Sequence, residues 1–429
     1  MTTLGYSIVI SIVCGVYLLY LLSHKRYRLI IPSTIHTFTW LLVGVLISLT
    51  LSGYVGKTTN QSAADFDLVV VYVLGMVISS IVGFSIAHIV YPFRLIKGNA
   101  GIPSKKLNYV LRKYRWILYL CFVIGLILIF YLVSIFGFRS LGDYRMTAVT
   151  LKYSGYGALA RQLSGHVMIL SGFYLAILGY KHGKDSLVFK EFFLCILAFS
   201  APNIAIAGRG WIVSSLLPYF VGYLLAKAQL NKKVKWSEKR NLIILLFSFI
   251  LLFSLLGVIR SEQNMYSRTD RLNKFLYYTD GSRMMNMVLH QYPPESFQLE
   301  YGASEFLGKW IGSPMAEKFN KSIEHDLGLL VTVKSSMPYL YYDFGYTGGI
   351  IMWGVFCFIF EVLCAYLQRK SSIICFIIFT EFAKILFQAP IGNIFGMEIP
   401  VFEWILIIYI IMRWFIPRKI SLSDEKQQM

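Results

Sequence analysis

The chain has 429 residues, of which 56% are hydrophobic and 15% are charged, and its formal net charge is +19. This composition is too apolar for a water-soluble globule, and repeated apolar runs predict an all-α, polytopic integral membrane protein. The positive charge does not indicate a nucleic-acid partner. Most Lys and Arg lie in short loops between the apolar runs, where they set orientation and meet anionic membrane lipids.

The six cysteines lie inside apolar runs, and none belongs to a metal-ligand pattern. Cysteines in such surroundings are expected to act as small hydrophobic side chains rather than as disulfide partners or metal ligands. They are Cys14, Cys121, Cys195, Cys357, Cys364 and Cys375.

The apolar runs predict about eleven transmembrane helices, with ten to twelve as the range. The first run has no basic segment before it and no small-residue cleavage site after it, so we expect a retained span rather than a signal peptide. In chain order the expected spans are Leu4–Leu22, Leu29–Tyr54, Leu68–Phe93, Trp116–Phe136, Leu163–Tyr180, Phe192–Ala207, Trp211–Ala226, Asn241–Val258, Gly349–Leu367, Ser371–Gln388 and Pro400–Met412.

Eleven spans place every short basic loop on the same side of the membrane. The loop after the first span contains Lys25, Arg26 and Arg28, and the loop after the third span contains seven basic residues. Short basic loops stay in the cytoplasm, so we expect the N-terminus outside and the C-terminus in the cytoplasm. We expect residues 1–429 to form a single transmembrane domain.

One large polar region, residues 260–348, lies between the eighth and ninth expected spans. Its first part, 260–334, holds nine basic and nine acidic residues. The span count places this region outside, as the one large outer loop of the domain. We expect it to cover a membrane-embedded site and to help form it.

Arginines gather at the expected outer ends of the helices. Arg209 lies between Gly208 and Gly210 after a span that contains a proline, and Arg260 ends the eighth span. Topology does not require positive charge on this side, and guanidinium groups bind phosphate oxygens bidentately, so the set favours a phosphate or pyrophosphate site. The alternatives are a headgroup anchor for Arg209 and ion pairs with nearby carboxylates for the others. The further members are Arg145, Arg161 and Arg283.

Asp343 lies among aromatic residues and glycines where the polar region re-enters the membrane. A carboxylate at this place could act as the base on a sugar hydroxyl, or it could cap the ninth helix. Glu262 and His325 are further candidates for the same base. Tyr341 and Tyr342 offer ring faces on which sugars stack, and tyrosines also suit the membrane interface.

Glu381 and Lys384 lie three residues apart in the tenth expected span. Residues at this spacing share one face of a helix and can pair. Charges inside a span usually point into the helix bundle, so we expect a structural pair more than a proton path.

The chain resembles the Wzy-type O-antigen or oligosaccharide repeat-unit polymerases. The resemblance covers the whole topology and rests on Gly208-Arg-Gly210, on Arg260, on the long outer loop and on Asp343-Phe-Gly345-Tyr-Thr-Gly348. The related O-antigen ligases have a similar acidic motif after a His-Asn pair, where this chain has Ser336-Met-Pro338. An Arg-x10-Gly repeat of some polymerases is not found in the outer loops.

The resemblance implies a GT-C-like membrane glycosyltransferase at the periplasmic face of the bacterial inner membrane. It would transfer a glycan linked to undecaprenyl pyrophosphate onto a newly flipped repeat unit, without a metal or other cofactor. Arg209 and Arg260 would hold the pyrophosphate, Asp343 or Glu262 would be the base, and outer aromatics would hold sugars. The implied partners are undecaprenyl-pyrophosphate-linked glycans, membrane lipids and a chain-length regulator protein.

Three alternatives remain open at this point. A cell-surface acyltransferase would be expected to have a catalytic histidine or serine motif near the end of a span, and the sequence shows none there. A lipid-linked oligosaccharide flippase would also be basic and have many spans, but charges along several spans and no large outer region would be expected. An O-antigen ligase is disfavoured by the missing histidine before the acidic motif.

Overall fold

The computed structural model describes residues 3–23, 32–51, 67–91, 102–136, 155–185, 191–192, 195, 210–230, 285, 288–289, 336–368 and 372–388. Throughout this part the secondary structure is helical, and these residues form no strand. The helices are α1 (Thr3–Ser23), α2 (Pro32–Leu51), α3 (Asp67–Val90), α4 (Ser104–Lys113), α5 (Trp116–Phe136), α7 (Gly155–Lys184), α9 (Gly210–Gln229), α14 (Ser336–Gln368) and α15 (Ile373–Gln388).

The expected spans coincide with helices wherever the structure describes them at length. Both ends of α5 agree with the expectation, and α1, α3, α9 and α15 agree to within a few residues. The largest difference is α14, which begins at Ser336 rather than at the expected Gly349. The helix α4 was not expected as an element of its own. The expected eighth and eleventh spans and nearly all of the sixth lie outside the described residues, as does most of the polar region.

Four helical stretches in the described part are long and apolar enough to cross a membrane: Leu4–Ser23, Asp67–Val90, Ser104–Tyr131 and Asp343–Leu367. A shorter apolar helix, Pro32–Ser48, accompanies them. An all-helical arrangement with several such helices is typical of multi-pass membrane proteins, because every backbone polar group in a bilayer needs an internal hydrogen bond. The total of eleven spans stays a prediction.

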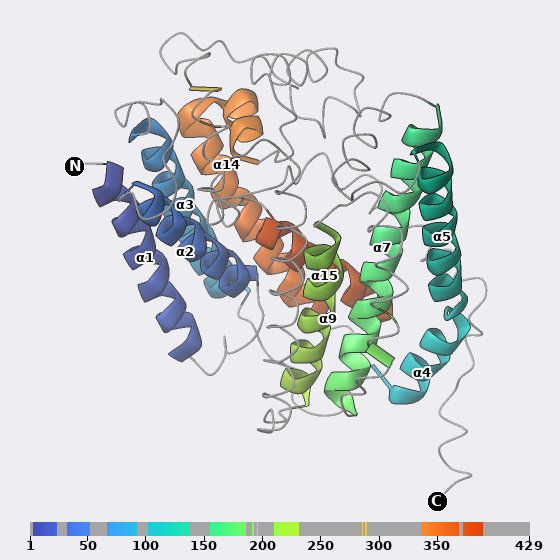
Figure 1. Cartoon of the computed structure of the whole chain (residues 1–429). Helices are drawn as coiled ribbons and strands as arrows, with labels where there is room; N and C mark the ends of the chain where they lie inside the picture. The colour runs from blue at the N-terminus through green and yellow to red at the C-terminus, as the bar shows by residue number, and fades with distance from the viewer. Residues whose placement is uncertain are drawn as a thin grey trace, which may run out of the picture.

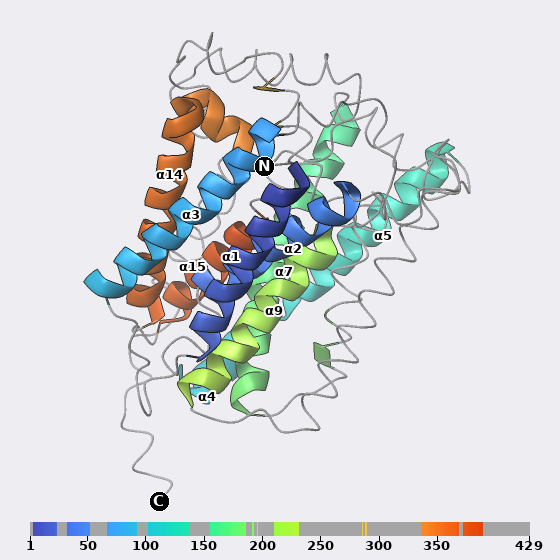
Figure 2. The same cartoon turned by 90° about the vertical axis from the view of Figure 1, so that its left-hand side faces the viewer.

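The helices form two groups that α15 joins. In one group α14 packs on α3, and α1 packs on α2 and α3; in the other α7 packs on α9, with α4 and α5 beside α7. The helix α15 contacts α2 and α14 of the first group and α7 and α9 of the second. Figure 1 shows the two groups on either side of α15, and in Figure 2, turned by 90°, helices of the two groups overlap.

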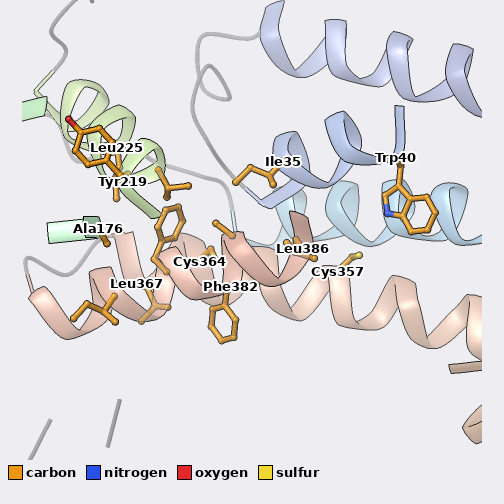
Figure 3. Packing of buried hydrophobic residues seen from close by; sticks show 14 of the residues in the cluster. Ile35, Trp40, Ala176, Tyr219, Leu225, Cys357, Cys364, Leu367, Phe382 and Leu386 are labelled. Carbon is orange, nitrogen blue, oxygen red and sulfur yellow. The ribbon is translucent and has the colours of Figure 1, made fainter. Parts of the chain in front are cut away.

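Buried side chains around α15 come from both groups. Phe382 and Leu386 of α15 are 9% and 0% exposed, and they lie among the side chains of α2, α7, α9 and α14 in Figure 3. Tyr219 of α9 and Cys357 of α14 are fully buried. Five cysteines are buried, Cys375 is partly buried, and all six are free thiols.

Glycines let the paired helices approach closely. A Cβ on Gly179 of α7 would collide with the backbone carbonyl of Tyr219, and a Cβ on Gly222 of α9 would collide with that of Ala176. The pairing of α3 with α14 has the same feature, since a Cβ on Gly83 would collide with the carbonyl of Gly354. Small residues at helix contacts are typical of membrane bundles, where dispersion contacts between helices replace the hydrophobic effect.

Large apolar side chains point away from the protein. On α5, Tyr119, Ile127 and Phe130 are 60%, 60% and 68% exposed. On α1, Val16 and Leu19 are 62% and 70% exposed. Exposed apolar surface of this extent is unfavourable in water and suits contact with lipid chains.

Candidate functional site

The acidic motif forms a break in α14. The backbone of Gly345 has φ 74° and ψ −178°, and the break divides the helix into a short first segment and a long second segment. This combination of angles is essentially restricted to glycine, because a Cβ would clash with the backbone. Asp343 lies two residues before the break, at the end of the short segment, and is only 5% exposed. Its carboxyl group is therefore held at one end of the long segment.

Three tyrosines pack around this break. The ring centroid of Tyr72 of α3 lies 5.1 Å from that of Tyr346 and 6.5 Å from that of Tyr341, both in edge-on geometry. Tyr346 donates a hydrogen bond of 2.7 Å to the backbone oxygen of Leu68. The start of α3 is thus bound to residues on both sides of the break, which fixes the short segment that carries Asp343.

The hydroxyl of Tyr72 lies against the second segment of α14. Tyr72 is fully buried, and its hydroxyl has no hydrogen-bond partner within the described residues. A Cβ on Gly349 would collide with this hydroxyl and would lie 3.0 Å from the backbone oxygen of Leu340. Gly349 therefore provides the space that Tyr72 needs. Sequence analysis missed Tyr72, because a tyrosine near the end of an apolar run resembles an interface anchor.

A polar cluster lies at the opposite end of α14. Glu361, 2% exposed, accepts hydrogen bonds of 3.0 Å from both the backbone N–H and the side-chain hydroxyl of Ser33. His88 Nε2 lies 2.7 Å from the carboxylate of Glu361. Ser33 follows Pro32 in the first turn of α2, where backbone N–H groups lack helical partners and a carboxylate is favourable. The cluster joins the start of α2, the end of α3 and the second half of α14.

Neither Glu361 nor His88 was singled out from the sequence. The signal that could have found Glu361 is a single carboxylate inside an otherwise apolar span, which usually faces a partner in the bundle. Ser33 and Glu361 are 328 positions apart, so their contact follows from the tertiary structure alone.

A second polar cluster joins the end of α7 to the middle of α9 and to Glu191. His182 Nδ1 lies 2.9 Å from the hydroxyl of Tyr219, and its Nε2 lies 3.3 Å from a carboxylate oxygen of Glu191. Lys181 Nζ donates a hydrogen bond of 3.2 Å to the same oxygen. The hydrogen bond from His182, with a further contribution from Lys181, lowers the pKa of Glu191 to about 2. Glu191 therefore stays charged and holds two basic side chains at the end of α7.

The expected pairing of Glu381 and Lys384 is confirmed. Lys384 Nζ donates a hydrogen bond to Glu381 Oε2 within α15. Both side chains are buried, at 2% and 7% exposure, and α15 lies between the two helix groups. The other carboxylate oxygen of Glu381 has no hydrogen-bond partner in the described part of the chain.

Two of the expected site residues can be located with their side chains: Asp343 and Tyr341. Both are buried in the first segment of α14, close to the α3 contact described above. Arg161 belongs to the backbone of α7 and Tyr342 to that of α14, but their side chains are not described. Arg145, Arg209, Arg260, Glu262, Arg283 and His325 lie outside the described residues. The gathering of arginines around the carboxylate therefore stays a prediction.

The described residues contain no group of three or more His, Cys, Asp or Glu side chains that could hold a metal ion. The chain was compared with protein-family models, with curated proteins and with solved structures, and none of the three comparisons gave a match. The functional argument therefore rests on the chain's own residues.

Proposed function

We propose that the chain is a membrane glycosyltransferase that polymerises undecaprenyl-pyrophosphate-linked oligosaccharide repeat units. The product would be O-antigen or a similar surface polysaccharide, made at the periplasmic face of the bacterial inner membrane. The fold would then be a GT-C-like bundle with the polar region 260–348 as its periplasmic cap.

The observation that carries the proposal is the position of Asp343. Asp343 is 5% exposed and lies at the broken end of a helix that is otherwise long enough to span the membrane. The Glu361 cluster lies toward the other end of the same helix, where α2 begins and α3 ends. Figure 1 shows the broken end of α14 at the top and the start of α4 and the end of α7 at the bottom. A carboxylate held at one end of the bundle suits a reaction on lipid-linked substrates at one membrane face.

In the proposed reaction a hydroxyl group of the newly flipped repeat unit attacks the anomeric carbon of the growing glycan. The new glycosidic C–O bond forms as the C–O bond to the pyrophosphate breaks. The proton of the attacking hydroxyl passes to Asp343, with Glu262 as the alternative base. Undecaprenyl pyrophosphate leaves, and Arg209 and Arg260 stabilise the negative charge that develops on it.

The proposal predicts the lengths of the glycans on cells that lack the gene. Deletion should reduce surface glycan to single repeat units on a gel, and the wild-type gene should restore the ladder of longer chains. Asp343→Asn, Arg209→Ala and Arg260→Ala should fail to restore it. Asp67→Asn is the matched control, because it neutralises another carboxylate at the same end of the bundle, in the first turn of α3.

Two outcomes would contradict the proposal. Long chains that persist in the deletion strain would show that another protein polymerises the glycan. Lipid-linked units that accumulate on the cytoplasmic side would instead identify the chain as a flippase.

A further inference from the structure

The helix α4 has two faces of opposite character. Its ten residues, Ser104–Lys113, contain four basic side chains and no acidic one. Leu107, Val110 and Leu111 are buried and share one face by their spacing of three and four residues. This apolar face packs against α7. The helix is therefore attached to the bundle by its apolar side, and its other side is turned outward.

Hydrogen bonds fix the start of α4 at the end of α7. Ile102 donates its backbone N–H to the hydroxyl of Tyr180 at 3.2 Å, and its backbone oxygen accepts a bond of 2.9 Å from Lys184. Ser104 donates to a carboxylate oxygen of Asp185 at 3.3 Å. Figure 1 shows α4 at the foot of α5 and α7, running obliquely to both. The orientation of its outward face is thus set by contacts at one end and along its length.

The outward face is basic. Lys105 and Arg112 are exposed and lie seven residues apart, so they occupy the same side of the helix. Arg115, in the turn that follows, is exposed as well. Lys113 Nζ lies 5.7 Å from the ring centroid of Tyr109, which is 37% exposed. The carboxylate of Asp185 contacts α4 at Ser104, its first residue. The basic residues continue to the last turn of the helix, away from this carboxylate.

The basic face adjoins a surface that suits lipid chains. The turn at Tyr114 and Arg115 leads directly into α5, with Ile117 N donating a bond of 3.0 Å to the oxygen of Tyr114. At the start of α5, Trp116 and Tyr119 are 52% and 60% exposed, and the exposed side chains that follow, from Leu120 to Phe130, are apolar. Aromatic residues between a charged surface and an apolar one are typical of the headgroup layer of a membrane.

We propose that the outward face of α4 and the start of α5 form a binding site for anionic phospholipid. Lys105, Arg112 and Arg115 would contact the headgroup phosphates, and the acyl chains would lie along the exposed side of α5. The basic face is complementary to anionic headgroups, and each Lys or Arg near such a surface contributes about fivefold in affinity. The site lies outside the Asp343 region and does not depend on the proposed transferase activity.

The experiment uses the purified full-length protein in detergent and measures retained lipid by native mass spectrometry. Phosphatidylglycerol is titrated against phosphatidylcholine with the same acyl chains. Wild type should retain phosphatidylglycerol selectively, and 0.5 M salt during equilibration should weaken this retention because it screens exposed charges. The triple variant Lys105→Gln, Arg112→Gln, Arg115→Gln should lose affinity by a factor on the order of 100.

Two further variants separate charge from folding. Lys105→Arg with Arg112→Lys and Arg115→Lys keeps the charge and should keep the selective retention. Asn108→Gln alters an exposed neutral residue of the same helix and should bind like wild type. If the triple glutamine variant cannot be purified, the lipid preference and the salt dependence of the wild-type protein still test the proposal.

Several results would overturn the proposal. One is equal retention of phosphatidylglycerol by wild type and a folded triple variant. Another is equal retention of the two lipids by wild type, and a third is retention that does not respond to salt. Competition by glycerol phosphate as effective as that by phosphatidylglycerol would show an anion site that takes no part of the acyl chains, and would also refute it.

Discussion

The break in α14 should depend on Gly345 through its backbone angles alone. At φ 74° and ψ −178° an alanine is strained, but a Cβ at this position would meet no atom beyond the neighbouring residues of the chain within 4 Å. The cost of Gly345→Ala therefore comes from the strained local backbone, with no contribution from contacts with other parts of the chain. Residues in such sparsely populated regions are destabilised by about 1–3 kcal/mol.

Gly15→Ala is the matched control for this variant. Gly15 lies inside α1, and a Cβ there also meets no atom within 4 Å. Because its backbone is helical, alanine should stabilise this position by up to about 1 kcal/mol. The two substitutions add the same methyl group to open space, so their free energies of unfolding should differ by about 1–4 kcal/mol.

The assay is equilibrium unfolding of the full-length protein in mixed detergent, followed by circular dichroism. The same variants, expressed in the deletion strain, report on glycan chain length. Gly345→Ala should shorten the ladder as well, because a change in the break displaces Asp343. The backbone argument is refuted if Gly345→Ala unfolds at the same free energy as wild type, or is stabilised as Gly15→Ala is expected to be.

Three further predictions concern buried contacts, each measured by the same unfolding assay. Gly349→Ala should destabilise the protein by about 1–3 kcal/mol through overpacking. Adding Tyr72→Phe should recover part of this loss, because it removes the oxygen that collides with the new Cβ. An unchanged loss in the double variant would contradict the placement of the Tyr72 hydroxyl. Lys384→Met should lower the free energy of unfolding by about 3–5 kcal/mol, because it leaves Glu381 unpaired. The double variant Glu381→Leu with Lys384→Met should lose far less, and equal losses in the two variants would contradict the ion pair. Glu361→Ala should lower the free energy of unfolding by about 3–5 kcal/mol. Glu361→Gln should lose less, because its amide oxygen still accepts one of the hydrogen bonds. An alanine variant as stable as wild type would contradict the cluster.

Much of the helix framework could be predicted because it is local. The limits of α5 follow from Arg115 before it and from a mainly apolar run without charged residues to Phe136. The pairing of Glu381 with Lys384 follows from their spacing of three residues on one helix. In both cases the determining interactions lie within one segment of the chain.

Other features could not be predicted, because they depend on contacts between distant segments. The position of Glu361 against Ser33 and His88 requires α2, α3 and α14 to meet at one end. The helix α4 lies in a segment whose many basic residues predicted a cytoplasmic loop rather than a helix. At the candidate site, the sequence indicated Asp343 beside glycines, but the role of Tyr72 depends on the packing of α3 against the break.

The most direct test of the proposed function is turnover by the purified protein. The full-length chain would be reconstituted in vesicles with undecaprenyl-pyrophosphate-linked repeat units from its host, and products and released carrier would be measured by mass spectrometry. The account predicts glycans of two or more repeats, one undecaprenyl pyrophosphate released per bond formed, and a rate about 10²–10⁴-fold lower for Asp343→Asn. Substrate that stays as single lipid-linked units with wild-type protein, or a full rate in Asp343→Asn, would contradict it.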